Sequence, residues 1–263
     1  MDVNAILIAV LVVGATGLII GLLLGVAGKK FEVETDERVL QVREYLAGSN
    51  CGGCGFAGCD ACAEAIVTGA CGPDACPPAG AAAAEAIGAI LGVQVEAGAR
   101  KAAFVKCAGS CDKTKMKSKY YGMHDCQKAA LIPGSTDKAC NYGCMGFGSC
   151  VTACKFDAVR IVKGVAVVDP EKCTACGACV SACPKALITL IPADAKYQVR
   201  CNSKDKGKDV KAVCVTGCIG CGICQKQCES DAIRMANNLA VIDPEKCTNC
   251  GKCAVKCPVK VIS

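Results

Sequence analysis

Regularly spaced cysteines are the residues of this sequence that could do chemistry. The chain has 27 cysteines in 263 residues, and two stretches, which start at Cys173 and Cys247, share the spacing Cys-x2-Cys-x2-Cys-x3-Cys-Pro. Thiolates at this spacing hold clusters of four irons and four sulfides (4Fe–4S), with three cysteines on one cluster and the fourth on its neighbour. The spacing therefore predicts pairs of clusters that pass single electrons.

Two further runs precede these stretches and reveal an internal repeat. They start at Cys144 and Cys218; the second is regular, whereas the first has Phe147 where a ligand is expected. Residues 139–188 align with residues 213–262 at a constant offset and without gaps, so Cys140 falls on Cys214. The runs resemble those of bacterial two-cluster ferredoxins. We therefore expect two ferredoxin-like modules in tandem.

Four ligand sets follow from these runs if Cys140 replaces the ligand that Phe147 cannot supply. The first module is expected to use Cys140, Cys144, Cys150 and Cys183 for one cluster, and Cys154, Cys173, Cys176 and Cys179 for the other. The second module is expected to use Cys218, Cys221, Cys224 and Cys257, and Cys228, Cys247, Cys250 and Cys253. Lys155 and Glu229 stand where the motif usually has Pro, and we expect this to alter the local turn but not cluster binding.

A separate group of cysteines near the N-terminus predicts a fifth cluster. The spacing Cys-x2-Cys-x4-Cys-x16-Cys is glycine-rich, and it comprises Cys51, Cys54, Cys59 and Cys76. Glycines let backbone N–H groups approach the sulfides, which tunes the reduction potential. A zinc site is the alternative, but its ligands are usually more evenly spaced. We expect the intervening Cys62 and Cys71 to be spare thiols.

A sixth cluster is possible in the segment between these groups. Cys107, Cys111 and Cys126 lie in the segment 99–139, and Cys140, Cys201 or Cys214 could supply the fourth ligand. The alternative is that these thiols are structural or free. Val105-Lys106-Cys107 resembles Val199-Arg200-Cys201 ahead of the second module. The lone His124 is not expected to bind iron.

An uncharged stretch from Ala5 to Ala27 predicts a membrane-spanning helix. Asp2 precedes the stretch and Lys29-Lys30 follow it, so the positive-inside rule places the N-terminus outside and every cysteine in the cytoplasm. A cleaved signal peptide is the alternative, but a basic start and an Ala-x-Ala site are both missing. Gly17, Gly21 and Gly25 share one helix face that could pack against membrane partners.

The composition agrees with a protein built around clusters. Aromatic residues make up 4% of the chain and Trp is absent, so a large conventional core is not expected, and folding should depend on cluster binding. The formal charge of +6 treats cysteines as neutral, whereas a 4Fe–4S cluster with four thiolates carries roughly −2. The lysines therefore balance cluster charge, and we expect no nucleic-acid partner. Closely spaced thiolates also require a reducing compartment.

The order of these elements resembles that of the B subunits of Rnf complexes, which are ion-translocating ferredoxin:NAD oxidoreductases. The resemblance covers the whole chain and favours the long form of anaerobic bacteria, although the small Cys-Gly-x-Cys-Gly domain is also similar to one in corrinoid iron–sulfur proteins. It implies a single-pass subunit of the cell (inner) membrane that takes electrons from soluble ferredoxin. Partner subunits would then hold flavin, reduce NAD and move sodium or protons.

The fold class that we expect is α+β. The predicted parts are a transmembrane anchor (1–28), a small helical 4Fe–4S domain (29–98), a cysteine-containing connection (99–139) and two ferredoxin-like modules (140–192 and 193–263). The sequence shows no acid–base pair, flavin motif or dinucleotide-binding turn, so we expect an electron relay of five or six clusters without a complete active site. A membrane-anchored donor to a soluble enzyme, such as a reductive activator of a corrinoid protein, is the alternative.

Overall fold

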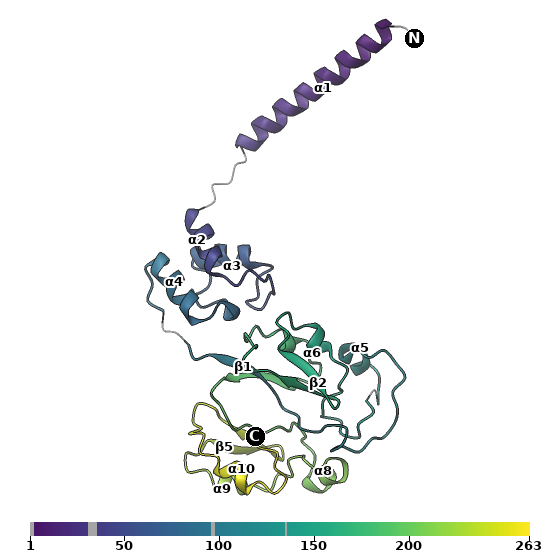
Figure 1. The fold of residues 1–263 in the computed structure, drawn as a ribbon, viewed down its shortest axis with the longest axis vertical. Coiled ribbons are helices and arrows are strands. Elements are labelled where there is room, and N and C mark those ends of the chain that lie inside the picture. The colour runs from purple at the N-terminus through teal and green to yellow at the C-terminus, as the bar shows by residue number, and fades with distance from the viewer. Residues whose placement is uncertain (1–2, 31–35, 96–97, 135) are drawn as a thin grey trace.

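A long apolar helix forms the N-terminal part of the chain (Figure 1). The computed structural model describes residues 3–30, 36–95, 98–134 and 136–263, and Asp2 lies outside them. Helix α1 (Val3–Lys30) contains an 18-residue window, Leu11–Gly28, with mean hydropathy 2.3 and none of it buried. At 1.5 Å per residue the helix is long enough to cross a bilayer. An added Cβ at Gly17, Gly21 or Gly25 would meet nothing within 4 Å, so the predicted packing face is uncovered.

Three helices form a small lobe after α1. They are α2 (Glu37–Tyr45), α3 (Cys59–Val67) and α4 (Ala81–Leu91), with a 3₁₀ turn, η1 (Pro77–Ala79), ahead of α4. The lobe is helical as expected, and Val42 and Leu46 are buried in one cluster with Ile66 and Ile87. Helix α4 ends at Gly92, whose φ of 70° is the left-handed cap that glycine adopts without strain.

The two repeats have the same order of short elements. The first contains α6 (Ser149–Thr152), the hairpin of β2 (Val159–Val162) and β3 (Val165–Val168), and α7 (Ala178–Ser181). The second contains α9 (Ile223–Lys226), the hairpin of β5 (Ile233–Ala236) and β6 (Leu239–Ile242), and α10 (Lys252–Lys256). Each short helix follows a glycine with a positive φ and buries one cysteine; these are Cys150, Cys179, Cys224 and Cys253.

Strand β1 (Lys101–Val105) belongs to the first repeat, although it precedes the predicted boundary at residue 140. It pairs antiparallel with β4 (Ile188–Pro192), and Val105 lies opposite Ile188. The second repeat has an equivalent bridge between Val199 and Ile262. Strand β1 therefore packs at the edge of the first module, ahead of the expected boundary. The similarity of Val105-Lys106-Cys107 to Val199-Arg200-Cys201 reflects this shared position.

Residues 106–117 lie between the two repeats and join them through backbone hydrogen bonds. Ala108 N–H donates to Arg200 O (2.9 Å) and Lys115 N–H to Val213 O (2.8 Å), both in the second repeat. Cys111 N–H donates to Lys163 O (2.9 Å) in the first. Two more short helices flank this junction: α5 (Cys126–Ala130) and α8 (Gly207–Val213).

Cysteines form much of each core. The first repeat, the second repeat and the N-terminal lobe each have one cluster of buried residues, and all three clusters mix aliphatic side chains with thiols. Across the described ranges, the fully buried hydrophobic residues include no aromatic side chain. This agrees with the expectation that apolar packing alone gives these modules little stability.

Candidate iron–sulfur sites

The structure brings together the cysteines predicted for three of the four clusters in the repeats. We call these groups site 1b (Cys154, Cys173, Cys176, Cys179), site 2a (Cys218, Cys221, Cys224, Cys257) and site 2b (Cys228, Cys247, Cys250, Cys253). Sites 1b and 2a each line a pocket, with about 300 and 340 Å³ of empty volume. Cysteines of site 2b gather in the core of the second repeat, where Cys247 and Cys250 lie near Cys253.

In the remaining predicted set of the first repeat, Cys140 does not line the pocket that the other three cysteines line. A pocket of about 400 Å³ is lined by Cys144, Cys150 and Cys183 together with Cys126, and we call this group site 1a. Cys140 lines a different pocket. The loop 118–134 contacts Phe147 through the rings of Tyr120 and His124, and it brings Cys126 to the pocket. Cys126 is therefore the fourth cysteine that lines this pocket, in the position that the sequence assigned to Cys140.

Stacked rings and hydrogen bonds hold this loop in place. The Phe147 ring stacks on His124, with centroids 5.1 Å apart and an interplanar angle of 2°, and on Tyr120 at 5.2 Å. Cys126 N–H donates to Ser149 Oγ (2.7 Å), and Ser149 Oγ donates to Asp125 Oδ2 (3.3 Å). His124 thus has a stacking role. These contacts fix Cys126 over site 1a.

Burial raises the pKa of one or more thiols in sites 1a, 1b and 2a. Burial raises the pKa of Cys150 to about 12, and the nearby thiols of site 1a act in the same direction. Burial also raises the pKa of Cys179 and of Cys224 to about 11, again with help from neighbouring cysteines of the same site. Since iron binds thiolates, loading must release these protons.

The N-terminal lobe places its cysteines around the start of α3. We call Cys51, Cys54, Cys59 and Cys76 site N. Cys59 and Cys76 are buried, Cys51 and Cys54 are half-buried, and Cys59 N–H donates to Asn50 Oδ1 (2.8 Å). Cys62 is also buried, and its burial together with nearby Cys54, Cys71 and Cys76 raises its pKa to about 12.

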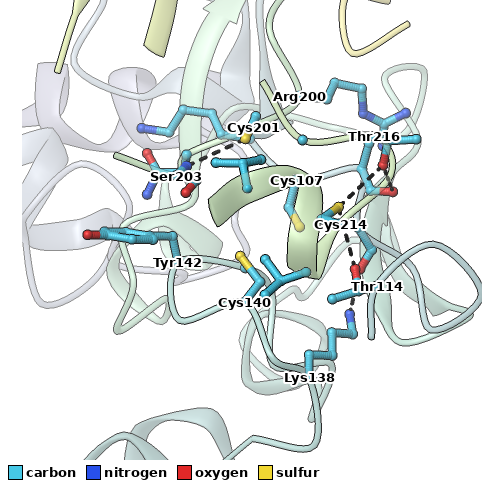
Figure 2. A pocket seen from close by; sticks show the side chains of 18 residues that line it. Cys107, Thr114, Lys138, Cys140, Tyr142, Arg200, Cys201, Ser203, Cys214 and Thr216 are labelled. Atoms are coloured by element: carbon cyan, nitrogen blue, oxygen red, sulfur yellow. Dashed lines mark hydrogen bonds between the residues drawn. The ribbon is translucent and has the colours of Figure 1, made fainter. Parts of the chain in front are cut away.

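The structure separates the three cysteines that were predicted to share a sixth cluster. Cys126 belongs to site 1a, and Cys111 is exposed, next to the Lys163-Gly164 turn. Cys107 lies instead with Cys140, Cys201 and Cys214 around a pocket between the two repeats (Figure 2). Cys201 and Cys214 are the candidate site residues that sequence reasoning named only as options for a fourth ligand.

A fully buried lysine lies between site 1a and this pocket. Lys138 is 2% exposed, and its Nζ donates to Gly109 O (2.9 Å), Cys144 O (3.1 Å) and Gly164 O (2.6 Å). Half-buried Lys185 lines site 1a, and its Nζ donates to Asn141 O (2.7 Å). Burial lowers the pKa of Lys185, while nearby Cys140, Cys144 and Cys107 act in the opposite direction. Buried cations without carboxylate partners fit a place where negative clusters bind.

The thiols of these sites line shared pockets but do not converge on one point among the described residues. Among the described residues, no three His, Cys, Asp or Glu side chains converge closely enough to hold a single metal ion. A zinc ion requires four ligand atoms about 2.0–2.3 Å from one centre. In a 4Fe–4S cluster each thiolate binds a different iron, so the sulfurs stand apart around a central space. Sites 1a, 1b and 2a fit the second arrangement.

Comparisons with known proteins agree with iron–sulfur binding. The chain matches the Fe-S cluster family over residues 46–78, the 4Fe-4S binding domain over residues 166–189 and the 4Fe-4S dicluster domain over residues 217–261. It is 47% identical to the B subunit of the Na⁺-translocating ferredoxin:NAD⁺ oxidoreductase complex of Acetobacterium woodii, over 99% of this chain and 78% of that one.

Two further relatives match over nearly their whole length. The B subunit of the ion-translocating oxidoreductase complex of Methanosarcina acetivorans is 44% identical, over 97% of this chain and 96% of its own. The B subunit of the proton-translocating ferredoxin:NAD⁺ oxidoreductase complex of Clostridium ljungdahlii is 42% identical, over 98% of this chain and 92% of its own.

Proposed function

This chain belongs to the family of B subunits of ion-translocating oxidoreductase complexes, and we propose that it relays electrons from reduced ferredoxin through 4Fe–4S clusters to flavin- and NAD-binding partner subunits. Sites N, 1a, 1b, 2a and 2b would each hold one cluster, on an α+β fold that comprises a helical lobe and two ferredoxin-like modules. When bound, each cluster supplies a centre that accepts and gives up one electron without proton transfer.

The observation that carries this proposal is that cysteine groups lie side by side within the N-terminal lobe and first repeat, and again within the second repeat. Site N packs on site 1b: a Cβ on Gly53 would overlap Cys176 O, and Lys155 Nζ donates to Asn50 O (3.1 Å). Sites 1a and 1b share the core of the first repeat, and sites 2a and 2b share that of the second. Sites in series suit a relay, because each electron moves only to a neighbour.

Substituting Gly53 should slow transfer across this first junction. Gly53→Ala adds a Cβ that overlaps Cys176 O and must push the N-terminal lobe away from site 1b. We expect unchanged iron content and a slower exchange of electrons between site N and the rest, measured by freeze-quench EPR. Gly98→Ala is the matched control, because its added Cβ meets nothing within 4 Å. Equal rates of electron exchange in both variants would show that this contact does not control transfer from site N to site 1b.

Helix α1 supports a membrane anchor for this subunit. Its described side chains, Leu11–Gly28 among them, are exposed and mostly apolar, which suits lipid rather than water. Lys30 at its C-terminal end favours the cytoplasmic side for the sites, with the N-terminus outside and a location in the cell (inner) membrane. The uncovered face of Gly17, Gly21 and Gly25 would receive helices of partner subunits.

Lysines around site 2b suit an acidic electron carrier. An open groove beside exposed Cys250 is lined by Lys226, Lys252 and Lys256. Lys252 pairs with Glu229, and the other two lysines are exposed. A reduced ferredoxin carries negative clusters, so the lysines that line this groove should attract it towards site 2b.

The test is reduction of the anaerobically purified full-length chain, held in detergent, by reduced ferredoxin. The clusters should bleach in the visible spectrum, and the rate should fall as salt rises because docking is electrostatic. A variant with Lys226→Glu and Lys256→Glu should be reduced at least about tenfold more slowly at low salt, whereas Lys204→Glu and Lys208→Glu, at other surface positions, should not. Full iron content without reduction by ferredoxin would refute the proposed function.

The alternative was a membrane-anchored donor to a soluble enzyme such as a corrinoid-protein activator. Similarity to B subunits over almost the whole chain supports the translocase subunit instead. Association with multi-span and flavin-containing partners in detergent extracts would support the same choice.

A further inference from the structure

Four cysteines outside the matched family ranges surround a pocket at the junction of the two repeats. Cys107, Cys140, Cys201 and Cys214 all line this pocket, and Figure 2 draws their side chains around it. Two of them, Cys107 and Cys214, are buried, and the other two are half-buried. The three family models match residues 46–78, 166–189 and 217–261, so none of them covers these thiols.

Glycines keep this pocket open near the sulfurs. A Cβ on Gly109 would lie 3.4 Å from Cys214 Sγ and 3.7 Å from Cys107 Sγ. A Cβ on Gly143 would lie 3.4 Å from Cys140 Sγ and 3.8 Å from Cys107 Sγ. The sulfurs are therefore close neighbours in pairs, and the chain presents bare backbone where a side chain would fill the space between them.

Hydrogen-bond donors face the sulfurs. Cys144 N–H donates to Cys107 Sγ (3.4 Å), Ser203 N–H to Cys201 Sγ (3.5 Å) and Thr114 Oγ1 to Cys214 Sγ (3.7 Å). Arg200 also lines the pocket, and its buried Nε has no partner among the described residues. Donors of this kind favour thiolates over neutral thiols and are typical of the surroundings of iron–sulfur clusters.

The four cysteines form two equivalent pairs. Cys140 aligns with Cys214 in the repeat, and Cys107 and Cys201 hold matching positions after Val105 and Val199. Each repeat thus contributes the same two thiols to the pocket from opposite sides. Thiols that are only structural or free are not expected to converge in this symmetric arrangement. Thiols that bind one shared group are.

We propose that Cys107, Cys140, Cys201 and Cys214 hold a further 4Fe–4S cluster that connects the two ferredoxin-like modules. The pocket contacts one site in each module. Cys144 N–H of site 1a donates to Cys107 Sγ, and Cys201 packs in the same core as Cys218 of site 2a. One electron enters this position from a neighbouring site and one leaves to the other, so no further reactant is needed. The inference deepens the proposed function, on which it rests, because it makes one relay out of two modules.

Iron counting on the full-length chain, prepared anaerobically in detergent, tests the proposal. The unaltered chain should hold about 24 irons, and Cys107→Ala, Cys140→Ala, Cys201→Ala or Cys214→Ala should each hold about 20, since each removes the same four-iron cluster. All four variants should lose the same EPR component. Cys111→Ala is the matched control, because this exposed thiol lies outside the pocket, and it should keep all of its iron.

The iron count decides whether the sixth cluster exists, and its result can be distinguished from a failure of the proposed function. About 20 irons in the unaltered chain, or zinc in place of the missing four, would overturn the sixth cluster even if every variant failed to fold. Variants that keep the full iron content would do the same. By contrast, a chain with about 24 irons that ferredoxin cannot reduce would refute the proposed function and leave this site standing.

Discussion

Cys126→Ala should cost the chain about four irons, and adding Phe147→Cys to that variant should restore them. The expectation follows from site 1a, where Cys126 joins Cys144, Cys150 and Cys183 around one pocket. In the other three runs the position of Phe147 holds Cys176, Cys221 or Cys250. A thiol placed at residue 147 therefore has the backbone position of a ligand, and it can replace the one supplied by the loop.

The measurement is iron content with EPR on the single and double variants. Phe147→Cys alone is the control and should keep the iron of the unaltered chain, because Cys126 still fills the fourth position. Loss of the stacking between Phe147 and His124 should loosen the loop without removing a ligand. If Cys126→Ala keeps its iron, or if Cys140→Ala removes the site 1a signal instead, the assignment of Cys126 is wrong.

Lys138→Met should destabilise the chain and empty both site 1a and the pocket between the repeats. The substitution removes a buried positive charge and leaves the carbonyl oxygens of Gly109, Cys144 and Gly164 without a donor. An unsatisfied buried acceptor costs about 1–3 kcal/mol, and removing one partner of a buried charged group typically costs about 3–5 kcal/mol, so we expect a loss of about 3–5 kcal/mol. The charge matters as well, because each neighbouring cluster brings roughly −2.

Iron content and thermal unfolding under anaerobic conditions measure this effect. We expect a loss of about eight irons per chain, together with a lower unfolding temperature. Lys163→Met is the matched control: its side chain is 68% exposed and forms a 3.5 Å pair with Asp112, so it should cost less than about 1 kcal/mol. Full iron content and unchanged unfolding in Lys138→Met would show that the buried charge is not needed.

The motif spacing predicted most of the candidate sites, because each run of cysteines carries its own geometry. Cysteines three and four positions apart around a glycine-capped short helix lie on one side of it. Sites 1b, 2a and 2b therefore contain the cysteines that were expected, and the α+β class and the apolar helix also agree. Ligand roles stay predictions until iron is counted.

Spacing could not predict which thiol replaces Phe147. The missing sulfur comes from a loop whose path depends on the stacking of His124 and Tyr120 on Phe147, and this contact is not local in sequence. The sequence did indicate that Cys140 has a different role. Cys140 aligns with Cys214, and the second repeat has Cys214 although none of its ligands is missing. An extra cysteine in both repeats indicates a common role outside the four regular runs.

Comparing the two repeats also accounts for the loop that contains Cys126. Cys107 and Cys140 are 33 residues apart, whereas their equivalents Cys201 and Cys214 are 13 apart. The longer connection in the first repeat contains Cys126, and the shorter one in the second contains α8. The repeat that lacks a cysteine at residue 147 thus has an added segment whose Cys126 lines the same pocket.

The separation of ligands along the chain also sets the order in which sites can be completed during synthesis. Site N closes within 26 residues, from Cys51 to Cys76, so all of its thiols have left the ribosome early. The pocket between the repeats needs Cys214, which emerges more than 100 residues after Cys107. A nascent chain that stalls in the second repeat would therefore carry a finished N-terminal lobe and an open, oxygen-sensitive junction, which makes late translation the vulnerable stage of assembly.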